Sequence, residues 1–222
     1  MSKVVHPYAH RLVTLRDWKS RWFATDAKFV ENLKVDVTIR EFLEKRLRGS
    51  YVSSVEIERG QKAIRLIIRT SRPGMVIGRS GEGAIKLKAD IAKALKRAKL
   101  VVTDEVKLEI VEVTNPEADA KIVAYMLAEG LERRLPYRRV MKQLIEKVIA
   151  VRGVQGVKFY MGGRLGGAEI ARSEELKRGS IPLQTVRADI DFARERAHLA
   201  YGDIGIKVWI YKGLIFAKGE KK

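Results

Sequence analysis

The chain has 222 residues, 46% of them hydrophobic, and 45 Lys and Arg against 27 Asp and Glu give a net charge of +18. This composition can fill the core of one large domain or two small ones, and its positive excess indicates a nucleic acid or an anionic membrane as partner. No apolar run approaches the roughly 18 residues of a membrane span or forms a signal core, and no Cys is present for a disulfide or thiolate metal site, so we expect a cytoplasmic protein that binds nucleic acid and no membrane.

Residues 1–36 are expected to form an N-terminal extension with a short helix around Phe29. Within it, Trp18, Trp22 and Phe23 alternate with basic residues, an arrangement that can stack on bases. We favour the simpler interpretation for Trp22 and Phe23, that they hold the extension against a folded domain.

Residues 37–113 are expected to form the first domain. Apolar periodicity and turn residues define its elements. In chain order they are a helix over Ile39–Leu47, strands at Val55–Ile57 and Ile64–Ile68, a helix–turn–helix, and a strand at Val106–Ile110.

The turn of this domain is Gly78-Arg79-Ser80-Gly81, followed by a basic amphipathic helix to about Lys99. Glycines without a Cβ let a partner approach the backbone closely, and the start of a helix attracts phosphate. The spacing G-x-x-G occurs four times in the chain, so it means little alone. The preceding apolar turn, the internal Arg and the five Lys of the next helix favour a clamp on a nucleic-acid backbone over a plain turn.

The element order and the stretch Val76–Gly81, with Ile85 and Leu87 beyond it, resemble a type II KH domain. The resemblance implies a three-stranded mixed sheet with helices on one face and a loop that grips about four nucleotides, usually of single-stranded RNA. That role would fall on Gly78, Arg79, Ser80 and Gly81. Many such loops have two basic inner residues, whereas here the second is Ser80.

Residues 114–213 are expected to form a second α+β domain, and 214–222 a short basic tail. Asn115 resembles a helix N-cap, with Pro116 at the first helical position. Pro136 separates two helices, and four strands with alternating apolar residues follow. This order predicts two helices on one face of a four-stranded, mainly antiparallel sheet.

The second of these helices, about Tyr137–Val151, is strongly basic on one side. Its apolar residues share one face, while Arg138, Arg139 and Lys142 cluster on the opposite face. Like charges at this spacing are mildly unfavourable, and the nearest acidic candidate is Glu146. A solvated face is the ordinary alternative, but we favour an anionic ligand, with RNA as the best candidate.

The stretch Gly162–Glu174 is similar to the signature of the bacterial-type small ribosomal subunit protein S-three family, and Lys3–Pro7, Leu183–Asp191 and Gly205–Gly213 support the resemblance. It implies a structural constituent of the small-subunit head, a ribonucleoprotein component acting in translation. Members bind small-subunit rRNA, line the channel through which mRNA enters and assist mRNA unwinding without an ATP site. The channel cations match Arg138, Arg139 and Lys142, and proteins S-ten and S-fourteen are the expected neighbours.

Other basic residues are candidates for contacts with rRNA. The glycines of Gly162–Gly167 have a structural interpretation, a bulged hairpin that permits close backbone approach. The possible rRNA contacts are Arg133, Arg134, Arg164, Arg172 and Lys86.

An enzyme is the first alternative. Asp189 and Asp191 share a strand face and could hold Mg²⁺, but a solvated face or a pairing with Arg187 is the favoured interpretation. We therefore expect no catalytic residue, metal, cofactor or small-molecule substrate. A free KH-type regulator or ribosome assembly factor is the second alternative, against which the Gly162–Glu174 signature argues.

Overall fold

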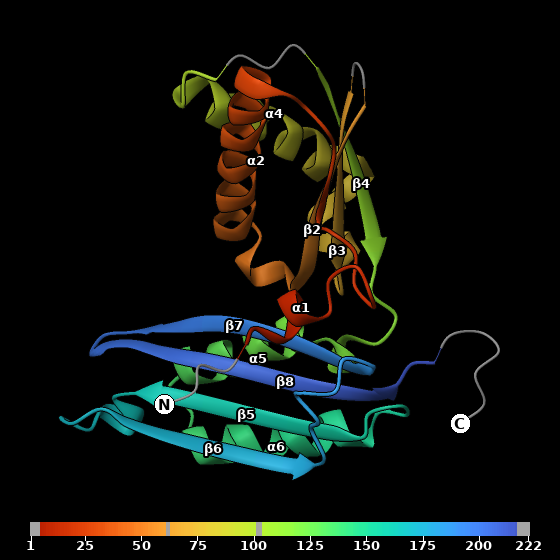
Figure 1. Cartoon of the computed structure of the whole chain (residues 1–222). Coiled ribbons are helices and arrows are strands. Elements are labelled where there is room, and N and C mark those ends of the chain that lie inside the picture. The colour runs from red at the N-terminus through yellow and green to blue at the C-terminus, as the bar shows by residue number, and fades with distance from the viewer. Residues whose placement is uncertain (1–4, 61–62, 101–103, 217–222) are drawn as a thin grey trace. The chain divides into compact units, whose positions relative to one another are not determined.

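The computed structural model describes residues 5–60, 63–100 and 104–216 (Figure 1), and the chain divides into two compact units. One unit is Trp18–Thr114, and the other combines the chain up to Asp17 with the part from Asn115 onward. Residues 3 and 4 of the Lys3–Pro7 motif and the expected basic tail from residue 217 lie outside the described residues. Each unit has a hydrophobic core of its own.

The Trp18–Thr114 unit is built on a mixed sheet of order β1-β2-β3-β4. The pair β2/β3 is antiparallel, while β1/β2 and β3/β4 are parallel. This is the expected mixed sheet with the two-residue β1 added at its edge. Its elements are β1 (Ser20–Arg21), α2 (Asp26–Arg46), η1 (Arg48–Ser50), β2 (Val52–Arg59), β3 (Ala63–Thr70), α3 (Pro73–Ile77), η2 (Arg79–Gly81), α4 (Glu82–Arg97) and β4 (Glu105–Glu112).

Helices α2 and α4 lie on the same side of this sheet (Figure 1). Ile39 and Leu43 of α2 meet Leu87 and Ile91 of α4 in a buried cluster with the fully buried Leu66 of β3. Burying such side chains contributes about 1.5–3 kcal/mol each. Because this core fixes the helices against the sheet, it also fixes the position of the turn between α3 and α4.

Helix α2 differs from the expectation of a short helix followed by a separate one. It runs unbroken from Asp26 to Arg46, through the boundary expected between residues 36 and 37. Its apolar residues lie on two faces: Ile39 is buried, whereas Phe29 is 46% exposed. The two separate apolar patterns therefore belong to one continuous helix, of which the later part carries the buried residues.

The aromatic residues before α2 behave differently from one another. The indole N–H of Trp22 donates to Asp36 Oδ2 over 2.8 Å, and Arg59 pairs with Asp36 in a buried salt bridge of 2.6 Å. The expected anchoring role is confirmed for Trp22. It is wrong for Phe23, which is 89% exposed and has no core position to fill.

The second unit contains an antiparallel sheet of order β6-β5-β8-β7, with α5 and α6 on one face (Figure 1). This agrees with the predicted two helices on four strands. Its elements are α1 (Pro7–His10), η3 (Pro116–Ala118), α5 (Ala120–Glu132), α6 (Tyr137–Ala150), β5 (Gly156–Gly163), η4 (Leu165–Gly167), β6 (Arg172–Gly179), β7 (Ala188–Leu199) and β8 (Gly202–Leu214).

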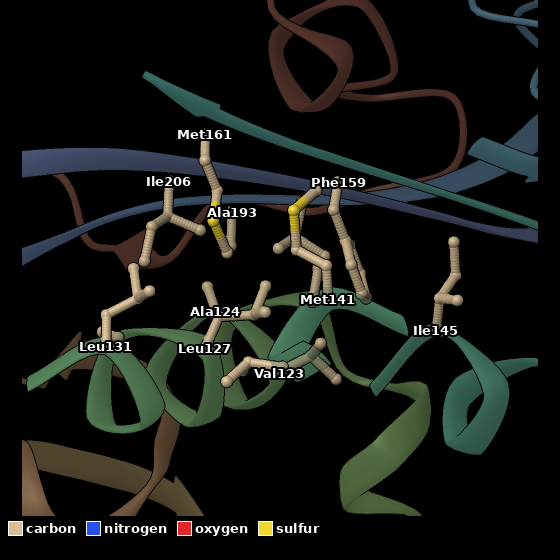
Figure 2. Close-up of a cluster of buried hydrophobic side chains, with 14 of the residues drawn as sticks. Val123, Ala124, Leu127, Leu131, Met141, Ile145, Phe159, Met161, Ala193 and Ile206 are labelled. Atoms are coloured by element: carbon tan, nitrogen blue, oxygen red, sulfur yellow. The ribbon is translucent and has the colours of Figure 1, made fainter. Parts of the chain in front are cut away.

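Figure 2 shows the core between these helices and the sheet. Leu127 from α5 and Met141 from α6 point toward Phe159 and Ile206 on the strands, and all four are buried. Gly130 lets α5 and α6 approach, because a Cβ there would lie 2.9 Å from Val140 Cγ1. The cationic side of α6 is therefore fixed by a close-packed opposite side.

The start of α5 differs from the expectation. Asn115 makes no side-chain capping hydrogen bond, and Pro116 belongs to the short η3 turn. The cap is Asp119, whose Oδ1 accepts from the N–H groups of Lys121 and Ile122 over 2.9 and 3.1 Å. An Asp–Ala pair is an equally good helix start, and the local sequence did not distinguish the two.

The first described residues form an arm that belongs to the second unit. Arg11 is fully buried, and burial lowers its pKa while nearby Asp189 opposes that shift. Its guanidinium donates to four backbone carbonyls at 2.6–3.0 Å, those of Pro7, Leu183, Thr185 and Ala188. The expected continuous extension over 1–36 is thus divided between the two units after Asp17.

Candidate nucleic-acid interface

The turn between α3 and α4 has the backbone that its glycines predict. Gly78 and Gly81 adopt positive φ angles of 71° and 82°. Ser80 also lies in the left-handed region, at φ 51° and ψ 23°, which is uncommon for a residue with a side chain. Arg79 and Ser80 are exposed at the tip of the turn.

The glycines of this turn have separate functions. A Cβ on Gly78 would lie 2.9 Å from Gly83 N, and one on Gly83 would lie 2.7 Å from the carbonyl oxygens of Val76 and Ile77. These two glycines therefore permit the close crossing of α3 and α4. A Cβ on Gly81 would meet no atom within 4 Å, so Gly81 leaves open space beside Arg79 for a partner.

The surroundings of the turn are basic and partly apolar. The side chain of Arg79 has no ion pair with a described residue, whereas Lys86 lies 3.5 Å from Glu82 one helical turn away. Met75 and Ile85 flank the turn and are 60% and 70% exposed. Such a surface can bind a phosphate at Arg79 and the α4 start, and contact bases through its apolar flanks.

Helix α6 displays its cations as predicted. Val140, Met141, Ile145 and Val148 are buried, whereas Arg138, Arg139 and Lys142 are exposed. Within the described part of the chain, Arg139 and Lys142 form no ion pair, and Glu146 does not pair with Lys142. We call Arg138, Arg139 and Lys142 the α6 cationic face.

Arg138 has an acidic partner that the sequence pattern does not reveal. Its Nε donates to Glu174 Oε1 on β6 over 3.1 Å. This hydrogen bond and the negative charge of Glu174 raise the pKa of Arg138. The prediction that the nearest acidic candidate is Glu146 was wrong, because strand β6 places Glu174 beside the helix.

Two further cations lie where α5 ends. Arg133 pairs with Glu129 one turn earlier in α5. Arg134 adopts a positive φ of 60°. Its backbone N–H donates to the carbonyl oxygen of Leu131, and the backbone N–H of Leu135 donates to the carbonyl oxygen of Gly130. This is a Schellman ending whose left-handed position usually carries Gly. An exposed Arg in that position projects a charge close to the start of α6.

The remaining candidate cations are used differently. Arg164 Nε donates to the carbonyl of Ala168 over 2.8 Å, and its Nη1 donates to that of Tyr201, so much of its donor capacity supports the loop. Arg172 is exposed at the start of β6.

Close backbone approach is confirmed at Gly163, where a Cβ would lie 3.1 Å from the carbonyl oxygen of Asp203. The β5–β6 register has no bulge.

The two strand carboxylates are each engaged by the fold. Arg16 Nη2 lies 2.6 Å from Asp189 Oδ1, and Asp191 Oδ2 accepts from the N–H of Ala120 over 3.0 Å. Arg16, which the sequence pattern did not single out, is thus an ion-pair partner of Asp189. In the described residues no three His, Cys, Asp or Glu side chains gather as metal ligands, and no helix there is long and apolar enough for a membrane span.

Two family models match the chain. The model of the KH domain matches residues 38–118, which include the α3–α4 turn. The model of the ribosomal protein S3 C-terminal domain matches residues 127–210, which include the α6 cationic face and most of the second sheet.

Full-length relatives agree with both models. The small ribosomal subunit protein uS3 of Clostridium novyi is 44% identical over 96% of this chain and 93% of its own length. The uS3 protein of Photobacterium profundum is 46% identical over 96% and 90%, and that of Magnetococcus marinus is 44% identical over 98% and 100%. The chain belongs to the bacterial uS3 family. Both halves of the sequence resemblance, the type II KH domain and the S-three signature, are thereby confirmed.

The uS3 fold also presents residues that the sequence patterns did not single out. Tyr160 and Lys207 lie on the face of the second sheet that α5 and α6 leave uncovered, with Lys207 Nζ 5.2 Å from the Tyr160 ring centroid. The alternation Lys158-Phe159-Tyr160 was the available signal. This alternation predicts a strand, but it does not identify the uncovered face, because that face is defined only by the pairing of the strands and the position of the helices.

Proposed function

We propose that this uS3 chain binds small-subunit rRNA as a structural component of the ribosomal head, and that its α6 cationic face contacts mRNA entering the ribosome. The observation that carries the proposal is the exposure of Arg139 and Lys142 without ion-pair partners among the described residues, on a helix fixed by a packed core. Family membership supports a place on the small subunit, in the cytoplasm.

The cations act on phosphates. Arg138, Arg139 and Lys142 lie within two turns of one helix, so they can contact successive backbone phosphates of one strand. Such contacts hold a separated strand without reading its sequence. They assist unwinding by stabilising single-stranded mRNA, and they require no nucleotide hydrolysis at this site.

The KH turn is proposed as a second RNA contact. Gly78, Arg79, Ser80 and Gly81 combine an exposed cation, an exposed hydroxyl and open space at Gly81. The start of α4 adds N–H groups without a side-chain cap. These features fit the phosphate backbone of a short single-stranded segment.

Contacts with rRNA and with neighbouring proteins are also proposed from membership of the uS3 family. We propose rRNA contacts for the exposed Lys86, Arg133, Arg134 and Arg172 and for the unused donors of Arg164. Proteins S-ten and S-fourteen are proposed as neighbours. Residue-resolved crosslinking in intact small subunits would test all of these contacts together.

Small subunits carrying Arg138→Ala/Arg139→Ala/Lys142→Ala test the mRNA proposal. The measurement is translation of an mRNA with a stable hairpin relative to an unstructured one. We expect a selective loss on the structured message. The control Lys45→Ala/Lys147→Ala/Arg152→Ala removes three other exposed cations. Equal loss in both variants, or none in either, would contradict the assignment of the α6 cationic face.

Sedimentation separates the ribosomal proposal from a free KH-type regulator. In a low-salt gradient, we expect the full chain to travel with small subunits and to remain there in all growth phases. Recovery solely in ribosome-free fractions would support the regulator and reject the ribosomal role.

A further inference from the structure

One face of the second sheet lacks a helical cover. In Figure 1, α5 and α6 lie behind the strands β5 to β8, and their core contacts come from alternate strand positions. The intervening positions point to the other face. We call it the open sheet face, formed by Lys158, Tyr160, Glu175, Lys177, Phe192, Arg194, Lys207 and Trp209.

Strand pairing arranges these residues in two adjacent rows across the sheet. Neighbouring strands in a sheet lie about 4.8 Å apart, and rows on one face are about 6.7 Å apart. From β6 to β7, the first row is Lys177, Lys158, Trp209 and Phe192, and the second is Glu175, Tyr160, Lys207 and Arg194.

Aromatic rings and cations touch throughout these rows. Lys158 Nζ lies 5.6 Å from the centroid of the Trp209 ring, and Arg194 Cζ lies 5.4 Å from that of Phe192. The Phe192 and Trp209 ring centroids are 5.0 Å apart. The indole N–H of Trp209 is buried beneath this surface and has no acceptor among the described residues.

The rows carry a strong positive excess. Lys177, Arg194 and Lys207 are exposed and form no ion pair with a described residue. Lys158 pairs with Glu175 over 2.7 Å, and Glu175 is the single acidic residue in the two rows. Four cations thus face one carboxylate on a surface that also offers half-buried aromatic rings.

Among the described residues, other parts of the chain cover one end and one edge of this face. Ile181 and Leu183 pack against Ala188, Ile190 and Tyr211, in a cluster that also includes Trp209 of the first row. At the edge, the His6 ring meets Phe192 at 4.7 Å in an edge-on geometry. At the centres of the rows, on β5 and β8, Lys207 is exposed, and Lys158, Tyr160 and Trp209 are half-buried.

We propose that the open sheet face binds a short segment of single-stranded RNA. Bases stack near Tyr160 and Trp209 while Lys177, Arg194 and Lys207 contact phosphates, a combination typical of sheet-based single-strand recognition. An acidic protein segment would use the cations but gain little from the rings. The site is separate from the α6 cationic face, which belongs to the helical layer on the opposite side of the same sheet.

The test removes the other proposed RNA contacts first. A full-length background protein carries Arg79→Asp/Ser80→Asp and Arg138→Ala/Arg139→Ala/Lys142→Ala. Its affinity for a fluorescein-labelled oligouridine of eight nucleotides is measured by anisotropy over a salt series. In this background we expect residual binding that depends on the open sheet face, so failure of the α6 or KH proposals does not affect the outcome.

Two substitutions then probe the face. Tyr160→Leu should weaken binding about five-fold or more through lost stacking, whereas Tyr160→Phe should retain it. Lys207→Ala, at an exposed position, should lower the salt slope by about 0.7. The matched control is Lys147→Ala, an exposed lysine on α6.

The proposal is overturned if Lys207→Ala and Lys147→Ala have equal effects on affinity and slope. Ultraviolet crosslinking of intact small subunits provides a second, independent test of the proposal. RNA attached to the peptides containing Tyr160 or Trp209 supports the proposal. Attachment of this face to a protein neighbour, without RNA, rejects it.

Discussion

Arg138 Nε and Glu174 Oε1 lie 3.1 Å apart, and this hydrogen bond joins α6 to β6 across 36 residues of sequence. Both side chains remain accessible, at 71% and 34% exposure. The pairing orients Arg138 and neutralises part of its charge. The α6 cationic face therefore has one restrained cation beside Arg139 and Lys142, for which the described residues supply no partner.

Replacing the acidic partner should strengthen binding. Glu174→Gln removes the negative charge beside Arg138, so we expect tighter binding of single-stranded RNA and a steeper salt dependence, with an unchanged melting temperature because exposed pairs contribute little to stability. Anisotropy titrations and thermal melts measure the two effects. Glu169→Gln, an exposed acid elsewhere, is the control, and an equal gain from both variants would contradict a specific effect at Arg138.

Arg134 should show opposite effects on stability and binding. Gly tolerates the left-handed backbone at the end of α5 better than Arg does, so Arg134→Gly should stabilise the second unit by about 0.5–1 kcal/mol while weakening RNA binding through the lost charge. Arg134→Ala separates the two causes, because it removes the charge and keeps the strain. Urea unfolding and RNA titration measure them, and unchanged RNA affinity in both variants would show that Arg134 makes no contact.

The glycines of the KH turn should respond unequally. Gly78→Ala forces a Cβ to 2.9 Å from Gly83 N, so we expect a loss of more than about 2 kcal/mol in the stability of the Trp18–Thr114 unit. Gly81→Ala meets no neighbour and should cost about 1 kcal/mol for its positive φ. Hydrogen exchange of the β3 amides measures both, and equal losses would refute the separate functions assigned to them.

Acidic substitutions test the turn as an RNA contact. Arg79→Asp/Ser80→Asp places two negative charges at exposed positions, so RNA binding should weaken by repulsion while the fold is retained. Crosslinking from this turn is the measurement, with Arg79→Gln/Ser80→Ala as a neutral control. Undiminished crosslinking in the acidic variant would make the turn purely structural.

Arg11 should be essential for the stability of the second unit. Arg11→Met leaves four backbone carbonyls without their charged donor, so we expect a loss of about 3 kcal/mol or more. Arg16→Ala, which breaks the partly exposed pair with Asp189, should cost about 1 kcal/mol or less. Hydrogen exchange in β7 measures both, and similar protection in the two variants would refute the importance of Arg11.

Local patterns predicted the elements that local physics determines. The α3–α4 turn depends on glycines at fixed spacing, and the α6 cationic face depends on helical periodicity within one segment. The partner of Arg138 was not predictable, because Glu174 reaches it only through the pairing of β6 with β5. Arg11 was missed for a related reason: a basic residue in an irregular segment indicates exposure, and its buried site is formed by carbonyls far along the chain.

The placement of Arg11 also sets an order for biosynthesis. The carbonyl acceptors at Leu183 and Ala188 are made 172 and 177 residues after the arginine. At about 5–20 residues per second, the arm waits roughly ten seconds or longer for its binding site. The Trp18–Thr114 unit can complete its own core in that interval. Arg11 therefore cannot be buried in its final site until residues 183–188 have been synthesised.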